Sequence, residues 1–544
     1  MKKQASILQS DHKTDNSSLS KGRPSLAVNA ASNWMALGIN MLVGFFLTPY
    51  IISSLGLGSY GIWALVVSVV GYYGLLDLGV SSAILRYVAR YAGQRDHVRL
   101  NEVMNTSIAI FSVMGAIVAV VTYFAAGPLA GFFNVAAGDR ILFQRSIVLL
   151  GTTAGFMFPG NVLHVAIIAH ERFATKNILL TTCTVIRALL IVVVLRGGGD
   201  IVDLSVVNLA VCVFGTALNF SVVKIYFPCI RFSWRMCKKA VLRSLLTFGF
   251  FSCISQIGNL LHTKIGAVVI GRFLTMKLVG VYNISLLMSM YALKLIISCS
   301  GVFQPRLSSL AGVASGKAFA NSVMRYSMIV SNFSVAIGVT GCLLCRDFLK
   351  LWLPDNFGDT TTAEYVFYIL LISLVPNLMT DVSANALLAV KKHKYLAYQT
   401  VLEGVVNLCL SIYLIGKFGI MGVAIAAAIP ATIARVVVQP IYCCRILGIK
   451  WFSYMRQIMI IPLLVSVAML LFANFSGVLL VAVTYPQLIF KGVIVFGVYM
   501  LIAFYVCIDT QMQHEVFARL SRLYLGVIGV VFRKGLIGSE NSDV

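Results

Sequence analysis

The sequence predicts an all-α integral membrane protein with about 14 transmembrane helices. Hydrophobic residues make up 59% of the 544 positions, and mean hydropathy is +0.90. A spanning helix needs about 20 mostly apolar residues, and apolar stretches of that order recur along nearly the whole chain. The predicted spans are 29–52, 59–80, 104–127, 144–169, 175–195, 203–227, 244–268, 280–300, 323–345, 364–388, 397–415, 419–443, 457–479 and 486–508.

The spans divide the chain into five expected parts. Met1–Pro24 is polar and has no short apolar run with a cleavage site, so we expect a disordered tail rather than a signal peptide. Spaced apolar and basic residues near the carboxyl end favour an amphipathic helix on the inner leaflet, with a partly ordered tail as the alternative. The predicted parts are a disordered cytoplasmic tail (1–26), an N-lobe of spans 1–6 (27–230), a C-lobe of spans 7–12 (231–447), spans 13–14 (448–509) and a cytoplasmic amphipathic tail (510–544).

The net charge of +24 reflects membrane topology rather than nucleic-acid binding. When the amino terminus is placed inside, 30 of the 43 Lys and Arg residues fall on the inner side. Nine fall on the outer side and four lie within spans. This asymmetry is what the positive-inside rule predicts, and it requires an even number of spans. We therefore expect both termini to be cytoplasmic.

An internal repeat relates the two halves. A shift of 222 positions places Gly44 on Gly266, Tyr60 on Tyr282 and Gly79 on Gly301. It also places Arg172-Phe173 on Lys394-Tyr395, just after a proline-containing span. The shift covers six spans, and six is even, so the two units share one orientation in the membrane. This predicts a parallel repeat of two lobes with a substrate site between them.

Charged residues within the spans are the first candidates for function. A charge at the bilayer centre costs at least about 2.5–3.5 kcal/mol, so it needs a partner or a water-filled cavity. Asp77 lies at the inner end of span 2, where pairing with a nearby arginine is the simpler interpretation and a proton or cation site is the alternative. Arg435 and Glu403 lie near the cytoplasmic ends of their spans. The charged residues within spans are Arg187, Lys264, Lys294, Arg435, Asp77, Asp381 and Glu403.

Polar residues recur on one face of several predicted helices, and we call each such row a polar stripe. Residues three and four apart share a helix face, and a stripe facing lipid is costly, so the stripes should line an interior. The alternative is that they only join helices by hydrogen bonds. The stripes are Ser252, Ser255, Asn259 and His262 in span 7, Asn377, Asp381 and Asn385 in span 10, Gln399, Glu403, Asn407 and Ser411 in span 11, and Asn33 and Asn40 in span 1.

The sequence shows no pattern of catalysis or metal binding. There is no phosphate-binding glycine loop, no paired histidine–carboxylate metal motif and no nucleophile elbow. The twelve cysteines are scattered, with only Cys443 and Cys444 adjacent, which argues against a disulfide framework or a zinc site. The short connections leave no room for a catalytic domain. We therefore expect a transporter without catalytic residues, metal or cofactor.

The amino-terminal half resembles the polysaccharide transporter family, which includes O-antigen and exopolysaccharide flippases, of the multidrug/oligosaccharidyl-lipid/polysaccharide exporter superfamily. The likeness is strongest in Asn33–Arg90 and extends loosely over spans 1–12. The residues that carry it are Leu55-Gly56-Leu57-Gly58-Ser59-Tyr60-Gly61-Ile62-Trp63, Leu75-Leu76-Asp77-Leu78-Gly79-Val80, Ala83-Ile84-Leu85-Arg86-Tyr87 and Ala169-His170-Glu171-Arg172-Phe173.

The resemblance implies a V-shaped pair of six-helix bundles that moves undecaprenyl-pyrophosphate-linked oligosaccharides across the inner membrane. The implied partners are this lipid-linked substrate, membrane lipids, H+ or Na+ as coupling ions, and polysaccharide polymerase or export machinery, but no nucleic acid. Spans 13 and 14 resemble those that help form a groove for the lipid tail in the lipid II flippase. Span 1 departs from that flippase because it lacks arginines.

A pyrophosphate needs cations along its path, so we expect a cationic cavity reached by alternating access. The expected ion-coupling or charge-pairing residues are Asp77, Asp381 and Glu403. One alternative is a drug/cation antiporter of the same superfamily, which would favour an acidic cavity. Another is a membrane glycan polymerase or ligase. The expected substrate-binding residues are Lys264, Lys294, Arg187, Arg435, His262 and Asn259.

Overall fold

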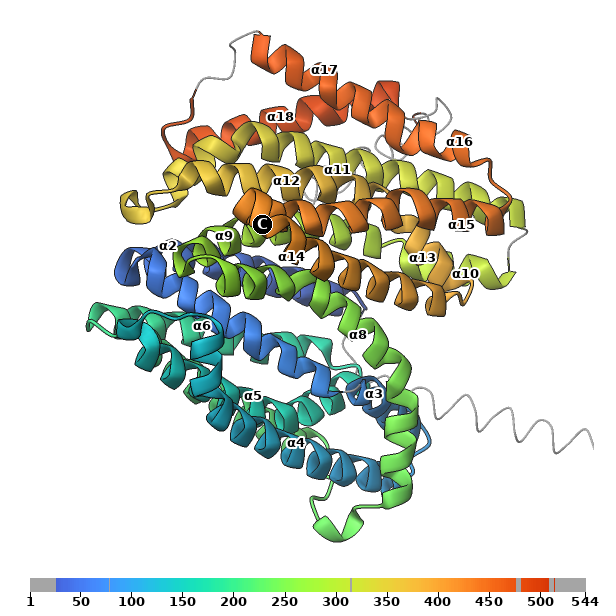
Figure 1. The fold of residues 1–544 in the computed structure, drawn as a ribbon. Helices are drawn as coiled ribbons and strands as arrows, with labels where there is room; N and C mark the ends of the chain where they lie inside the picture. The colour runs from blue at the N-terminus through green and yellow to red at the C-terminus, as the bar shows by residue number, and fades with distance from the viewer. Residues whose placement is uncertain (1–25, 78, 314–315, 476–480, 508–512, 514–544) are drawn as a thin grey trace, which may run out of the picture. The chain divides into compact units, whose positions relative to one another are not determined.

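All regular secondary structure in the described residues of the computed structural model is helical (Figure 1). The described residues are 26–77, 79–313, 316–475, 481–507 and 513. The predicted tails, 1–26 and 510–544, lie almost entirely outside them. The helices are α2 (Leu26–Gly71), α3 (Val80–Gly93), α4 (His97–Phe132), α5 (Arg140–Ala169), α6 (Phe173–Arg196), α7 (Ile201–Tyr226), α8 (Lys239–Phe273), α9 (Met276–Gly301), α10 (Gln304–Val313), α11 (Gly316–Trp352), α12 (Thr360–Met379), α13 (Asp381–Ala389), α14 (His393–Thr432), α15 (Gln439–Leu447), α16 (Trp451–Met455), α17 (Ile461–Phe475) and α18 (Tyr485–Val506).

Eleven helical segments in the described residues are long and apolar enough to cross a membrane, which confirms the predicted fold class. Two of them, of 47 and 54 residues, are about 70 and 80 Å long at 1.5 Å per residue. A bilayer core is only about 30 Å thick. Each of these segments contains a glycine with a positive φ, Gly56 at 78° in α2 and Gly419 at 56° in α14. Each break separates two of the predicted spans.

The predicted span at 244–268 corresponds to α8, which is not among the eleven. The count of fourteen spans remains a prediction, while the described part of each predicted range is mainly helical.

Helix boundaries follow the predicted repeat. A shift of 222 carries α3 to 302–315, where α10 lies, and α4 to 319–354, where α11 lies. The same shift carries α6 to 395–418, within the part of α14 that begins at His393 and ends before the break at Gly419. Glu171 and Lys391 both have φ of 61° in the turns that precede α6 and α14. These turns match at an offset of 220, so Arg172-Phe173 corresponds to Lys392-His393 and the predicted pairing with Lys394-Tyr395 is wrong.

The chain forms two compact units, each described here by itself. Unit 1 contains Met1–Tyr291, Trp352–Leu370 and His393–Pro430. Within it α5 packs against α4, α7 and α3, and α6 packs against α2 and α7. α4 and α5 approach so closely that a Cβ built on Gly115 would lie 2.2 Å from the carbonyl oxygen of Gly155. Small residues permit such backbone contact between membrane helices.

Unit 2 contains Ala292–Leu351, Leu371–Lys392 and Ala431–Val544. A buried ion pair joins two of its helices, with Lys491 Nζ of α18 donating to Asp347 Oδ2 of α11 at 2.7 Å. The backbone amide of Ala482 donates to the same oxygen at 3.1 Å. The side chains are only 14% and 9% exposed. The pair therefore ties the last described helix to α11.

This ion pair gives a stability prediction. Replacing Asp347 with Asn keeps an acceptor for the Ala482 amide but leaves Lys491 buried without its counter-charge, which costs about 3–5 kcal/mol. We expect a clearly lower melting temperature of the purified protein in detergent. The double variant Asp347→Asn/Lys491→Met removes both charges and should recover most of the loss. A double variant as unstable as the single one would contradict this account.

Candidate functional site

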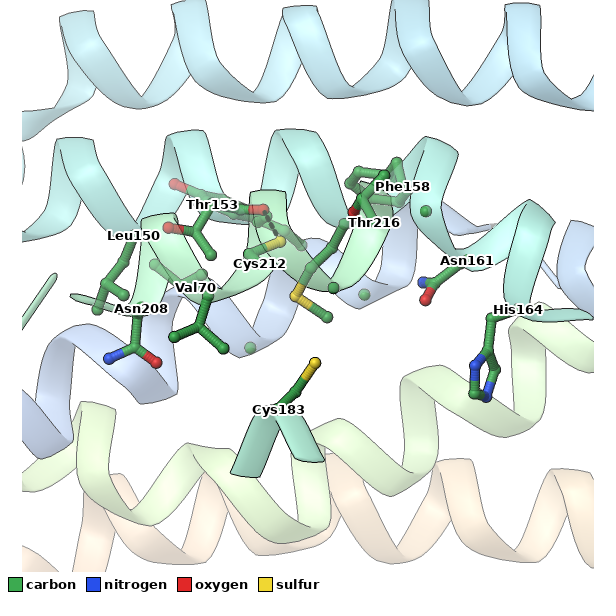
Figure 2. A pocket seen from close by; sticks show the side chains of 18 of the residues that line it. Val70, Leu150, Thr153, Phe158, Asn161, His164, Cys183, Asn208, Cys212 and Thr216 are labelled. Carbon is green, nitrogen blue, oxygen red and sulfur yellow. Dashed lines mark hydrogen bonds between the residues drawn. The ribbon is translucent and has the colours of Figure 1, made fainter. Parts of the chain in front are cut away.

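The main candidate site is a cavity of about 640 Å³ within unit 1. Its walls come from α2, α5, α6 and α7, with the 3-10 turn Tyr72–Asp77, the start of α3 and Gln256 of α8 at one end. Most of the wall is apolar. Figure 2 shows Asn161, His164, Cys183 and Asn208 arranged around one space. We call this space the Arg187 cavity, because Arg187 is the one arginine that lines it.

Arg187 reaches the cavity from α6. Its Nε is buried and has no hydrogen-bond partner among the described residues. The Oδ1 of Asn219 on α7, which lines the same cavity, is also buried and without a partner in that part of the chain. Buried polar groups are normally satisfied, so this unpaired donor and acceptor indicate a place for a polar or anionic ligand.

A polar stripe on α7 lines part of the cavity, and the sequence analysis did not identify it. Asn208, Cys212, Thr216 and Asn219 recur at steps of four, four and three, and all four line the cavity. Cys212 Sγ donates to the Thr153 carbonyl at 3.6 Å. The spacing criterion that identified the stripe of span 11 would have identified this one in span 6. His164, which the sequence alone did not favour, also lines the cavity.

Asp77 lies at the end of the cavity formed by the 3-10 turn Tyr72–Asp77. Its Oδ1 accepts from the Ser81 hydroxyl at 2.7 Å and from the Ser81 amide at 3.1 Å. Gln256 Nε2 of α8 lies 3.5 Å from Oδ2. None of these described contacts is an ion pair with an arginine, so the pairing of Asp77 with a nearby arginine stays a prediction. The carboxylate is held by neutral donors.

Lys264 lies beside the cavity wall. Its Cε would be 3.4 Å from a Cβ built on Gly71, which lines the cavity. The side chain is half-buried, and its ammonium group has no hydrogen bond or ion pair among the described residues. Lys264 and Arg187 thus place two cations in or next to the same wall of unit 1.

The stripe of span 11 forms a ladder of hydrogen bonds along α14. Gln399 Nε2 donates to Glu403 Oε1 at 2.9 Å, and Ser411 Oγ donates to Asn407 Oδ1 at 3.1 Å. Asn407 also donates to the Leu261 carbonyl of α8 at 3.4 Å. Glu403 is only 2% exposed. These contacts favour the interpretation in which the stripe joins helices, because its polar groups bond along α14 and to α8.

The stripe of span 1 makes the equivalent contact in the other repeat. Asn177 of α6 donates to Asn33 Oδ1 at 2.6 Å, and Thr184 of α6 donates to Asn40 Oδ1 at 3.0 Å. The α2–α6 pair therefore corresponds to the α8–α14 pair, as the internal repeat predicts. In span 7, Asn259 is exposed and His262 is half-buried, and the side chains of Ser252 and Ser255 lie outside the description.

Asp381 and Arg435 belong to a second polar group, in unit 2. Asp381 Oδ2 accepts from the Ser300 hydroxyl of α9, and Asn385 Nδ2 donates to the same hydroxyl oxygen at 2.9 Å. Arg435 lies in a π-helical turn, Ile433–Val438, and its carbonyl accepts from Thr380 at 3.0 Å. π-turns interrupt the regular helix hydrogen bonds and recur at functional sites. Two residues of the predicted span 10 stripe, Asp381 and Asn385, thus bind α9, and Thr380 beside them binds the π-helical turn before α15.

Lys294 lies on α9 within unit 2 and is exposed. Lys264 belongs to unit 1, so the chamber shared by these two lysines remains a prediction. The described residues contain no group of three or more His, Cys, Asp or Glu side chains placed to hold a metal ion.

Comparison with known proteins decides the family. Residues 26–311, just over half of the chain, match the family described as "Polysaccharide biosynthesis protein". The chain belongs to this family. The match begins at the first residue of α2 and ends within α10, so it contains the whole Arg187 cavity.

Relatives cover nearly the full length of the chain. The "Uncharacterized membrane protein EpsK" of Bacillus subtilis (strain 168) is 24% identical over 89% of this chain and 96% of its own. The "Putative O-antigen transporter" of Shigella flexneri is 20% identical over 77% of this chain and 98% of its own. Among solved structures, "Lipid II flippase MurJ, inward closed conformation" matches with a TM-score of 0.66 and 14% identity, covering 88% and 99%.

These findings confirm the class predicted from the sequence. This member of the polysaccharide biosynthesis family has the fold of a lipid flippase. Several of its relatives are named as transporters or flippases. It is a multi-pass membrane transporter and not an enzyme, and the resemblance noted in Asn33–Arg90 is correct.

Proposed function

We propose that this protein translocates undecaprenyl-pyrophosphate-linked oligosaccharide units across the bacterial inner membrane, for surface polysaccharide synthesis. The observation that carries the proposal is the Arg187 cavity, where the buried Nε of a half-buried arginine has no hydrogen-bond partner among the described residues. Bidentate hydrogen bonding makes arginine well suited to phosphate oxygens. The amides of Asn161, Asn208 and Asn219 supply donors and acceptors for sugar hydroxyls.

The proposed transport cycle is alternating access by the N-lobe (27–230) and the C-lobe (231–447), with both termini cytoplasmic. The polar head would pass through the cationic interior while the prenyl tail stays in lipid. Lys264, next to the Arg187 cavity, and Lys294, on α9, are proposed to contact the head during the cycle. Asp77 and Asp381 are the proposed sites of coupling to H+ or Na+, since each carboxylate is held by neutral hydrogen-bond donors.

The assignment of the two lysines is tested by glycan export in cells that depend on this protein. We expect the double variant Lys264→Ala/Lys294→Ala to lose at least about 90% of export at normal protein level, because removing a charged hydrogen-bond partner costs about 1.5–3 kcal/mol each. The matched control is Lys277→Ala/Lys350→Ala, which removes one exposed lysine from each unit and should export normally. Unimpaired export by the first variant would refute the role of the two lysines.

A second measurement separates flippase from drug antiporter. Purified protein would be reconstituted in vesicles, and a lipid-linked oligosaccharide would be added to one leaflet. We expect the protein to move this lipid to the other leaflet, where an enzyme on that side can modify it. Cells expressing the protein should gain no resistance to cationic dyes. Dye resistance without glycan translocation would support the antiporter instead.

A further inference from the structure

The segment that joins α7 to α8 is bound tightly to the start of α4. Asn101 Oδ1 accepts from the Arg231 amide at 2.6 Å, and Asn101 Nδ2 donates to the Cys229 carbonyl at 2.9 Å. Asn105 Nδ2 donates to the Arg231 carbonyl at 2.7 Å, and Asn105 Oδ1 accepts from the Ser233 amide at 2.7 Å. Both asparagines are nearly buried, at 5% and 6% exposure. The segment is therefore a fixed part of unit 1.

This arrangement encloses a pocket of about 470 Å³, which we call the loop pocket. Four basic side chains line it, from His97, Arg231, Arg235 and Lys238, against a single acid, Glu102. The last three basic side chains are exposed, and none forms an ion pair with a described residue. The loop pocket shares no lining residue with the Arg187 cavity. It is a separate site with a surplus of positive charge.

Large apolar side chains project beside these cations. Trp234 is 76% exposed and Phe232 is 38% exposed, and both lie between or beside the pocket's arginines in the sequence. Val98, which lines the pocket, is 71% exposed. Exposed tryptophan next to arginine and lysine is typical of the headgroup region of a membrane. The positive-inside distribution places this segment on the inner side, where anionic lipids attract basic residues.

We propose that the loop pocket binds the headgroup of an anionic phospholipid. Arg231 and Arg235 would hold the phosphate oxygens, Lys238 would add a point charge, and Trp234 would lie at the level of the headgroups. A pocket of this volume is of the order that holds small ligands, about 300–1,000 Å³. Basic pockets on the inner face of membrane proteins are suited to such headgroups. Because the segment joins the two predicted lobes, lipid binding here would act on their connection.

The proposal is tested by native mass spectrometry of the full-length protein with added phosphatidylglycerol or phosphatidylcholine. We expect phosphatidylglycerol to be retained and phosphatidylcholine to be lost. The triple variant Arg231→Gln/Arg235→Gln/Lys238→Gln should bind phosphatidylglycerol at least about tenfold more weakly. The control triple Lys392→Gln/Arg445→Gln/Lys450→Gln removes the same charge from exposed positions and should bind normally. Equal retention of the two lipids, or equal weakening by the two triples, would overturn the proposal.

A variant that keeps every basic residue tests whether phosphatidylglycerol binding depends on the geometry of the loop pocket or only on its positive charge. Asn105→Ala removes the bonds from its side chain to the Arg231 carbonyl and the Ser233 amide, while Asn101 still accepts from the Arg231 amide. We expect several-fold weaker phosphatidylglycerol binding by a protein that still unfolds cooperatively, at a lower melting temperature because buried hydrogen bonds are lost. Full binding by this variant would show that the pocket geometry does not matter. If the triple variant lost undecaprenyl pyrophosphate binding while its phosphatidylglycerol binding was unchanged, the loop pocket would instead be a substrate site.

Discussion

Replacing Arg187 with Gln is expected to reduce glycan export at least tenfold without lowering protein abundance. The guanidinium has no hydrogen-bond partner among the described residues, so its removal breaks no described internal hydrogen bond or ion pair. A hydrogen bond to a charged group contributes about 1.5–3 kcal/mol, which corresponds to roughly a 10- to 150-fold change in binding. Arg187→Lys retains the positive charge but cannot form the two parallel hydrogen bonds that a planar guanidinium makes to phosphate oxygens. We therefore expect an intermediate level of export for this variant.

The control for this prediction lies on the same helix. Arg196 ends α6 and is exposed, so Arg196→Gln makes the same chemical change away from the cavity. Surface polysaccharide and membrane abundance would be measured for all three variants in one strain background. Normal export by Arg187→Gln would remove the cavity from the transport path, because the cavity's lining includes no other arginine or lysine.

Replacing Gly115 with Ala is expected to be among the most destabilising single-methyl changes in the chain. The new Cβ would lie 2.2 Å from the carbonyl oxygen of Gly155, and backbone cannot rotate away as a side chain can. Overpacking typically costs about 1–3 kcal/mol and can cost more. Gly155→Ala would meet the Gly115 carbonyl at 2.7 Å, so its effect should be smaller but still large.

A glycine on the same helix provides the control. Gly127 of α4 has only Gln144 Nε2 near its Cβ position, at 3.9 Å, which is ordinary contact. Melting temperatures in detergent should therefore fall in the order Gly127→Ala, Gly155→Ala and Gly115→Ala, from highest to lowest. An unchanged melting temperature for Gly115→Ala would mean that α4 and α5 are not in direct backbone contact.

The sequence was sufficient to predict the helical segments because their signals are local. Apolar length and positive-inside charge act within one span, and the 222-residue repeat was visible from a few matching glycines and tyrosines. The offset of 220 between the turns before α6 and α14 was not predictable. It was identified from the positive φ of Glu171 and Lys391, and neither residue type indicates such a backbone conformation in the sequence. The breaks at Gly56 and Gly419 coincide with the predicted gaps between spans.

The site was harder to predict because its residues come from separate helices. Arg187 was identified by its charge, but Asn161, Asn208 and Gln256 are neutral and distant in sequence, and only packing brings them together. Glu403 shows the opposite difficulty. Its charge within a span suggested a functional role, yet its carboxylate accepts a hydrogen bond from Gln399, its neighbour on the same helix face. Polar spacing alone does not distinguish a helix contact from a cavity wall.

The ion pair between Asp347 and Lys491 indicates that the last two predicted spans cannot be removed without destabilising the rest of the protein. A chain shortened before residue 448 would lose Lys491 and the Ala482 amide together, and would leave a carboxylate stranded inside α11. The part of the chain before residue 448 would therefore be destabilised if it were expressed without the residues that follow it. An engineered minimal version would need an uncharged residue at position 347 before the terminal pair could be removed.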